Sequence, residues 1–128
     1  MRLLLDTCTF LWVIGGSSDL SESAREEFRS PANEVFLSSV SVWEIAVKNK
    51  LGKLPLPEPC GQFILSQRSL HRIEPLALDE RAVLTLLKLP ELHKDPFDRM
   101  LICQAIAEGM MLLTPDPLIV QYPVSSLW

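Results

Sequence analysis

Short apolar segments alternate with helix-like stretches along the whole chain, and this alternation limits the possible fold more than any other feature. Strand-length apolar runs occupy residues 2–6, 34–38 and 110–114, and each is followed by at least one helix-like stretch or a chain turn. A weaker strand is expected at 72–76 and an edge strand at 123–128. Strands that alternate with helices form a mostly parallel sheet covered on both faces. We therefore predict an α/β fold of three layers, with a central, mostly parallel sheet flanked by helices.

Several of the expected helices have recognisable boundary residues. Ser21 is suited to cap the second helix, and either Ser39 or Ser41 is expected to cap the third. Asp95 followed by Pro96 has the pattern of an N-cap and a first helical residue. The six expected helices cover residues 7–14, 21–29, from Ser39 or Ser41 to 51, 60–70, 78–89 and 96–108.

Length and composition restrict the class of protein. A chain of 128 residues is expected to form one domain, residues 1–128. No apolar run approaches the roughly 20 residues of a membrane span, and the N-terminal apolar stretch is too short for a signal peptide. We therefore expect a cytoplasmic protein without membrane contact. The net charge of −4 argues against a broad basic surface for nucleic acid, but an acidic site that binds metal leaves a nuclease possible.

The three cysteines are Cys8, Cys60 and Cys103, an odd number without CxxC spacing. This arrangement argues against a disulfide framework and against a zinc site. Buried free thiols are expected instead. Cys8 is the exception whose role stays open, because it lies two residues from Asp6.

Four acidic residues lie where apolar segments end or turn. Asp6 follows the first strand, Asp116 follows the strand at 110–114, Glu44 is early in the helix after the second strand, and Asp98 is in the first turn of the last helix. Ligands of such folds bind beyond the carboxyl ends of the strands, so all four are expected at one edge of the sheet. Two carboxylates ~4 Å apart repel by roughly 4 kcal/mol. Such a cluster must take up protons or hold a cation, and Mg²⁺ or Mn²⁺ suits oxygen ligands.

Each acid also has a simpler interpretation. Asp6 could only cap the following helix, Glu44 could only pair with Lys48 one turn later, and Asp116 between two prolines could be a turn residue. These alternatives stay open at this point.

Two aspartates near the last helix need separate interpretations. Asp95 is well explained as the helix cap. Asp98 suits the helix dipole, but helical spacing places it on the face of Ile102 and Ala105, which is otherwise expected to be buried. A charge there needs a partner or an ion. We therefore assign Asp98 as a ligand and Asp95 as support.

The basic and imidazole side chains give weaker signals. His71 and His93 have no regular spacing to each other or to an acidic motif, so a catalytic histidine is not expected. Lys48, Lys50 and Lys53 form a basic patch that follows Glu44 and could hold a phosphate backbone. A merely solvated face is the alternative.

Taken together, these segments resemble the PIN-domain ribonucleases, specifically the VapC-like toxins of type II toxin–antitoxin pairs. The resemblance covers nearly the whole chain. It rests on Leu4-Leu5-Asp6-Thr7, on residues 20–25, 41–48 and 51–54, on His93-Lys94-Asp95-Pro96-Phe97-Asp98-Arg99, on Leu112-Leu113-Thr114-Pro115-Asp116 and on Leu127-Trp128.

The resemblance implies a PIN-like three-layer fold and Mg²⁺- or Mn²⁺-dependent endonucleolytic cleavage of RNA, with tRNA, rRNA or mRNA as the substrate. It also implies a cognate VapB-like antitoxin that blocks the site, and a homodimer. By position, Asp6, Glu44, Asp98 and Asp116 match the acidic quartet of the family. Two alternatives stay open: a DNA-acting nuclease with a similar acidic site, and a PIN-fold binding module without activity.

The roles that follow are specific. Asp6, Asp98 and Asp116 are expected to hold the metal, and Glu44 is expected to position or deprotonate the attacking water. The sequence departs from the family at Cys8, where His or Asn is frequent, and at Pro117, which removes a backbone donor near the site. Supporting or RNA-binding roles are expected for Thr7, Lys48, Asp95, Arg99 and Thr114.

Overall fold

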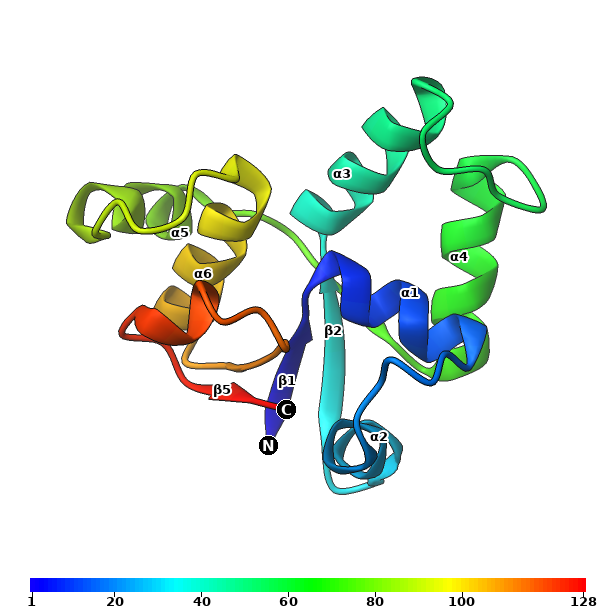
Figure 1. Cartoon of the computed structure of the whole chain (residues 1–128), viewed down its shortest axis with the longest axis horizontal. Coiled ribbons are helices and arrows are strands. Elements are labelled where there is room, and N and C mark those ends of the chain that lie inside the picture. The colour runs from blue at the N-terminus through cyan, green and yellow to red at the C-terminus, as the bar shows by residue number, and fades with distance from the viewer.

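The computed structural model describes residues 1–128, and its centre is a five-stranded sheet in the order β3-β2-β1-β4-β5 (Figure 1). Every neighbouring pair of strands is parallel, so the predicted α/β fold with a parallel sheet is confirmed. The strands are β1 (Arg2–Leu5), β2 (Glu34–Ser38), β3 (Glu74–Leu76), β4 (Met111–Leu113) and β5 (Ser126–Leu127).

Six α-helices connect and cover the strands, as predicted. Ser21 caps the second helix by accepting a hydrogen bond from the backbone N–H of Ala24. None of the helices combines the length and the apolar character needed to cross a bilayer. The helices are α1 (Thr7–Gly15), α2 (Glu22–Arg29), α3 (Ser39–Lys50), α4 (Cys60–His71), α5 (Glu80–Thr85) and α6 (Pro96–Glu108), with short 3₁₀ turns at Leu86–Lys88 and Ile119–Gln121.

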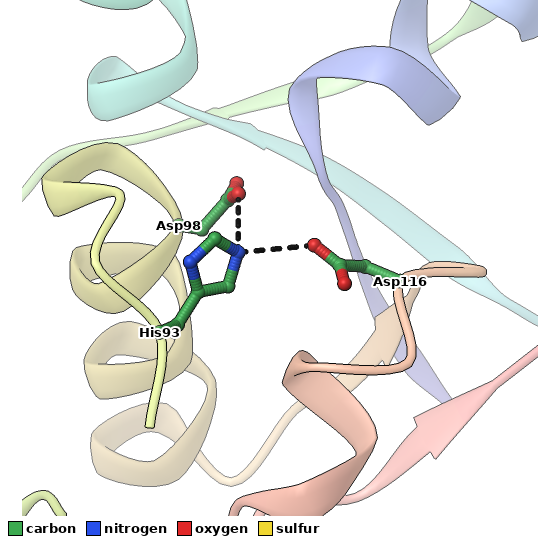
Figure 2. A group of neighbouring side chains, drawn as sticks. All are labelled: His93, Asp98 and Asp116. Carbon is green, nitrogen blue, oxygen red and sulfur yellow. Dashed lines mark hydrogen bonds and ion pairs between the residues drawn. The ribbon is translucent and has the colours of Figure 1, made fainter. Parts of the chain in front are cut away.

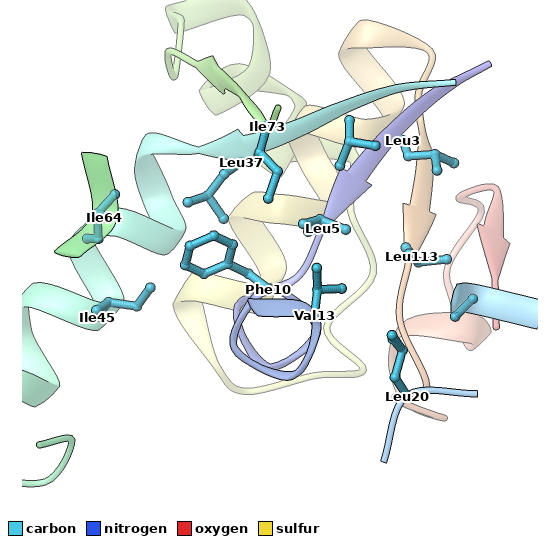
Figure 3. Close-up of a cluster of buried hydrophobic side chains, with 12 residues drawn as sticks. Leu3, Leu5, Phe10, Val13, Leu20, Leu37, Ile45, Ile64, Ile73 and Leu113 are labelled. Carbon is cyan, nitrogen blue, oxygen red and sulfur yellow. The ribbon is translucent and has the colours of Figure 1, made fainter. Parts of the chain in front are cut away.

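The central strand β1 divides the core into two clusters, one on each face of the sheet. Successive side chains of a strand point to opposite faces. Leu3 and Leu5 accordingly belong to one buried cluster and Leu4 to the other. The first cluster packs the sheet against α1, α3 and α4 through residues that include Phe10, Ile45 and Ile64 (Figure 3).

The second cluster covers the opposite face. It packs Leu4 and Leu112 of the sheet against Ile102 and Ala105 of α6, and against Ile119. The helices therefore lie on both faces of the sheet, as the three-layer prediction requires.

The cap of α3 and the extent of α5 differ from those predicted. Helix α3 is capped by Ser38, not by Ser39 or Ser41: the Ser38 hydroxyl accepts from the backbone N–H of Val40 and donates to the side-chain oxygen of Gln104. The reason is that β2 runs directly into α3, so the last strand residue serves as the cap.

The helix expected over 78–89 is shorter than predicted. Asp79 caps it, the α-helix covers only Glu80–Thr85, and a 3₁₀ turn follows. Leu89 is extended, with ψ of 130°, because Pro90 disfavours a helical conformation of the residue before it. Strands β3 and β5 are likewise shorter than the segments expected at 72–76 and 123–128.

Candidate active site

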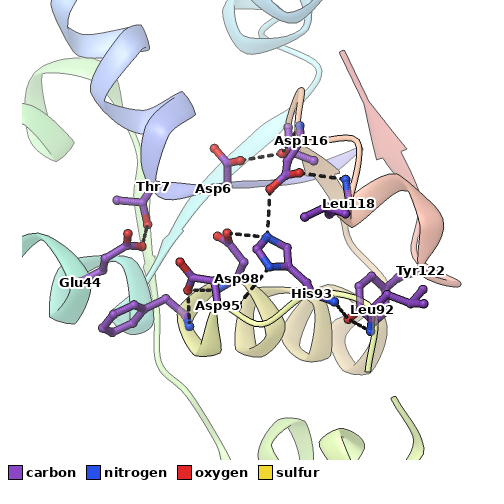
Figure 4. Close-up of polar contacts among 12 residues, drawn as sticks. Asp6, Thr7, Glu44, Leu92, His93, Asp95, Asp98, Asp116, Leu118 and Tyr122 are labelled. Atoms are coloured by element: carbon purple, nitrogen blue, oxygen red, sulfur yellow. Dashed lines mark hydrogen bonds and ion pairs between the residues drawn. The ribbon is translucent and has the colours of Figure 1, made fainter. Parts of the chain in front are cut away.

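The four acids predicted at one edge of the sheet line a single pocket with a volume of about 190 Å³ (Figure 4). Asp6 follows β1, Glu44 lies in the second turn of α3, Asp98 lies in the first turn of α6, and Asp116 follows β4. The parallel strands end at this edge and the helices that carry Glu44 and Asp98 begin there, which brings these distant residues together. The remaining lining residues are Thr7, Cys8, Trp12, Lys48, Asp95 and Pro115.

Asp6 is 5% exposed and both of its oxygens are engaged. Oδ1 accepts from the backbone N–H of Thr9 at 2.8 Å and so caps α1, while Oδ2 accepts from the hydroxyl of Thr114 at 2.6 Å. Burial raises the pKa of Asp6, and the hydrogen bonds from Thr114 and Thr9 oppose that rise. Asp6 is therefore a helix cap and a pocket carboxylate at once.

Glu44 is equally buried and has two side-chain partners. Oε1 accepts from the Thr7 hydroxyl at 2.7 Å, and Oε2 accepts from the Lys48 ammonium at 2.5 Å. The Thr7 oxygen also lies 3.0 Å from the hydroxyl of Ser41. The hydrogen bond to Glu44 raises the pKa of Lys48, so Lys48 stays charged. The predicted pair exists, and Lys48 also lines the pocket.

Asp95 caps α6 as expected from the helix boundary, and Asp98 faces the pocket. Asp95 Oδ1 accepts from the backbone N–H groups of Phe97 and Asp98, at 2.8 and 3.2 Å, and caps α6. Asp98 makes no such backbone contact. Burial raises its pKa to about 7, and the charges of Asp95, Asp6 and Glu44 add to this rise. The carboxylates are thus close enough to disfavour each other's ionisation.

Asp116 has one oxygen in a turn and one in the pocket. Oδ1 accepts from the backbone N–H of Leu118 at 2.9 Å, which is the turn role. The backbone N–H of Asp116 donates to the Thr114 hydroxyl oxygen at 3.1 Å. Thr114 therefore contacts both acids that follow β1 and β4.

His93 is the site residue that sequence reasoning missed. Its Nε2 lies 3.1 Å from Oδ2 of Asp98 and 3.1 Å from Oδ2 of Asp116 (Figure 2). His93 precedes α6 in a loop, so no regular spacing relates it to Asp98. The only available signal was its place in the run His93–Arg99. His71 lies elsewhere, against the ring of Phe28.

Of the basic residues expected to contribute, three lie outside the pocket lining. Lys50 and Lys53 are exposed and do not line it. Arg99 is half-buried on α6, also outside the lining, and lies near Cys103, where burial raises the pKa of the thiol and the Arg99 guanidinium opposes the rise.

Cys8, which the sequence sets apart from the other two cysteines, is exposed and lines the pocket. Desolvation at the pocket, together with the nearby carboxylates of Asp6 and Glu44, raises its pKa to about 11. Cys8 is therefore a neutral thiol near pH 7. Cys60 is half-buried, and Cys103 is buried as expected.

The donor set fits a divalent cation. Asp6, Asp98 and Asp116 supply carboxylate oxygens, the ligands preferred by Mg²⁺ and Mn²⁺. Ligand atoms of His93, Asp98 and Asp116 all lie within 4.8 Å of one another. Among the lining residues the single ammonium is that of Lys48, which is already paired with Glu44. Burial is the main cause of the raised pKa of Asp98, and a bound cation would offset both the burial and the repulsion from the neighbouring carboxylates.

A sequence model of the PIN domain matches residues 3–123, and the chain therefore belongs to the PIN domain family. This confirms the resemblance to PIN-domain proteins. The chain is 33% identical over 63 residues to Ribonuclease VapC16 from Mycobacterium tuberculosis. That match covers 49% of this chain and 45% of VapC16, less than half of either protein.

Solved structures share the fold over nearly the full chain. VapBC2 from Rickettsia felis, bound to a DNA fragment from its promoter, superposes with a TM-score of 0.75 at 18% identity, covering 99% of this chain and 98% of that one. DNA-bound VapBC from Salmonella typhimurium superposes with a TM-score of 0.71 at 18% identity, over 99% and 97%. The fold is thus the PIN-like three-layer fold.

Proposed function

We propose that the protein is a metal-dependent endoribonuclease of the VapC type that acts in the cytoplasm and hydrolyses phosphodiester bonds of tRNA, rRNA or mRNA. The observation that carries this proposal is the convergence of Asp6, Glu44, Asp98 and Asp116 in one pocket, where burial, with the neighbouring carboxylates adding to it, raises the pKa of Asp98 to about 7. Membership of the PIN domain family and the similarity to VapC16 support it.

Each acid has a proposed role in hydrolysis. Asp6, Asp98 and Asp116 would hold Mg²⁺ or Mn²⁺, which when bound supplies positive charge at the phosphate and lowers the pKa of water. Glu44 orients the attacking water and accepts its proton as the water oxygen bonds to phosphorus and the P–O bond to the leaving group breaks.

The neighbours of Glu44 support that role. Thr7 donates a hydrogen bond to Oε1 and Lys48 donates one to Oε2, and the two bonds together fix the orientation of the carboxylate. Lys48 keeps its charge at the edge of the pocket, where it attracts a phosphate of the RNA backbone. Asp95 supports the site indirectly, since it caps the helix that carries Asp98.

The proposed partner is a VapB-like antitoxin that covers the pocket, and a homodimer is the proposed assembly. The proposal of an antitoxin is supported by structural neighbours that are VapBC complexes.

A cleavage assay tests the proposed activity. RNA and DNA oligonucleotides of matched sequence, together with structured RNA and tRNA, would be incubated with the protein in Mn²⁺, in Mg²⁺ or in EDTA. The Asp6→Asn variant removes one proposed ligand, and Asp19→Asn, which changes an exposed aspartate outside the pocket, is the matched control. RNA cleavage that needs metal, persists in the control and disappears in Asp6→Asn supports the proposal.

Other results would favour the two alternatives. Cleavage of DNA but not of RNA indicates a DNA-acting nuclease. An inert binding module is indicated if nothing is cleaved and neither metal raises the melting temperature, because a ligand at 100 times its Kd stabilises a protein by about 2.7 kcal/mol.

A further inference from the structure

Hydrogen bonds to the backbone of the loop and to the ring hold the imidazole of His93 in one orientation. The backbone N–H groups of Leu92 and His93 both donate to the hydroxyl oxygen of Tyr122, at 2.9 and 2.6 Å (Figure 4). Tyr122 is itself buried in the core cluster around α6. The ring Nδ1 accepts from the backbone N–H of Asp95 at 3.1 Å. The loop before α6 therefore fixes where Nε2 points.

These contacts also determine the tautomer of His93. A backbone N–H is always a donor, so Nδ1 beside Asp95 must be an acceptor without a proton. A neutral imidazole with a bare Nδ1 carries its proton on Nε2. That N–H faces carboxylate oxygens of Asp98 and Asp116, which are acceptors. Donors and acceptors are thus matched at both ring nitrogens.

This polarity is the reverse of that found in metal-binding histidines. A ligating histidine presents the bare nitrogen to the metal and donates its other N–H to a carboxylate or a carbonyl. In His93 the bare nitrogen faces a donor, and the protonated nitrogen faces the acids. His93 is close enough to Asp98 and Asp116 to be a third metal ligand. The hydrogen bonds at its two ring nitrogens nevertheless argue against that role.

We propose that His93 is a positioning residue: its Nε2–H bridges Oδ2 of Asp98 and Oδ2 of Asp116 and holds the two carboxylates for the metal without binding the metal itself. This inference rests on the proposed function in one respect, namely that the site binds a metal. The bridge joins α6 to the segment after β4, so it sets the relative placement of two ligands that come from different elements. Outer contacts of this kind orient ligating carboxylates and sustain metal affinity.

The tautomer can be measured in the metal-free protein. Histidine is labelled with ¹⁵N, and long-range ¹H–¹⁵N correlation spectra distinguish the protonated from the bare ring nitrogen. The chain has two histidines, so the His71→Asn variant assigns the signals. The expected result is a proton on Nε2 of His93 and none on Nδ1. A proton on Nδ1 with a bare Nε2 would overturn the proposal. This result depends neither on cleavage nor on metal, so failure of the proposed function leaves it intact.

Metal binding provides the second test. Mn²⁺ affinity would be measured by calorimetry for the wild type, His93→Ala and His93→Gln, with His71→Ala as the matched control. Loss of the bridge in His93→Ala is expected to weaken binding about 10- to 100-fold. His93→Gln, whose amide supplies an N–H, is expected to bind more tightly than His93→Ala. Equal affinity in these two variants, or unchanged affinity in His93→Ala, would contradict the bridge.

Spectroscopy of bound Mn²⁺ separates a bridge from a ligand. Pulsed electron paramagnetic resonance detects the coupling of Mn²⁺ to a directly bonded ¹⁴N. The wild type is expected to show no directly bonded nitrogen, and its spectrum should match that of His93→Gln in this respect. A ¹⁴N coupling that is present in the wild type and absent in His93→Ala would show that His93 binds the metal.

Discussion

The hydroxyl of Thr114 lies 2.6 Å from Oδ2 of Asp6 and joins the segment after β4 to the residue that follows β1. The same hydroxyl oxygen accepts the backbone N–H of Asp116. One side chain thus orients Asp6 and anchors Asp116. It also opposes the rise that burial causes in the pKa of Asp6, because a hydrogen bond to the ionised carboxylate favours the charged form.

Replacement of Thr114 by Val should weaken metal binding most at low pH. Without the hydroxyl, the pKa of Asp6 rises further, and the metal must then displace a proton from it. We expect Thr114→Val to lower the free energy of unfolding by about 1–3 kcal/mol. Its Mn²⁺-induced shift in melting temperature should be reduced more at about pH 6 than at about pH 8. Thr85→Val, which changes a hydroxyl bonded only within α5, should keep the wild-type shift, and an equal loss at both pH values would contradict the explanation.

Asp98→Asn should change how the stability of the metal-free protein depends on pH. The folded-state pKa of Asp98 is about 7 against an ordinary 3.8, so the folded protein retains a proton that the unfolded chain has lost. This contribution to stability is complete below about pH 4 and is lost as the pH rises toward 7. Asp98→Asn has no carboxyl group at this position, so its stability does not fall in this way as the pH rises. Its free energy of unfolding relative to wild type should therefore rise across this interval, on the order of 4 kcal/mol, because each pKa unit between the folded and unfolded states corresponds to about 1.4 kcal/mol.

Denaturant unfolding in EDTA at several pH values measures this difference. Asp19→Asn, at an exposed position, is the control and should follow the wild-type profile. A constant difference between Asp98→Asn and wild type from pH 4 to about 7 would show that Asp98 titrates normally.

Lys48→Met should reduce cleavage while leaving metal binding nearly intact. The change removes the donor to Oε2 of Glu44 and the ammonium at the pocket, but none of the proposed ligands. We expect about a 10- to 100-fold fall in cleavage rate, the range of an impaired general base. Lys50→Met removes an exposed charge outside the pocket and should cleave normally. A similar fall in both variants would contradict a specific role of Lys48 and would indicate that each lysine only attracts RNA through its positive charge.

Tyr122→Phe should destabilise the loop that carries His93. The phenol oxygen accepts the backbone N–H groups of Leu92 and His93, and its loss leaves two partly buried donors without this partner. A fall of about 1–3 kcal/mol in the free energy of unfolding is expected, together with weaker Mn²⁺ binding because His93 is less well placed. Hydrogen exchange at these two amides measures the local effect. Unchanged protection at both amides would contradict it.

The placement of the acids could be predicted from the sequence because it depends on local patterns. The apolar run before Asp6 and the one before Asp116 are short and strand-like, and parallel strands end at a common edge. Asp95 and Pro96 likewise define a helix start through neighbouring residues alone.

The long-range contacts that hold the acids in place could not be predicted, because they join residues distant in sequence. Thr114 bonds a residue 108 positions earlier, and Tyr122 fixes His93 from 29 positions away. No periodicity encodes such pairs. The cap of α3 was missed for a different reason: Ser38 continues the strand pattern of β2, so an apolar pattern does not show that its hydroxyl caps the next helix.

The metal-dependent site is tested most directly by the rate of RNA cleavage as a function of free Mn²⁺, measured for the wild type and Asp98→Asn beside calorimetric binding of the same metal. We expect wild-type cleavage to saturate over the Mn²⁺ range in which binding saturates. Asp98→Asn should bind Mn²⁺ weakly and cleave no faster than wild type in EDTA. Cleavage by wild type in EDTA, or an Asp98→Asn variant as active as wild type, would contradict a metal-dependent site built on these acids.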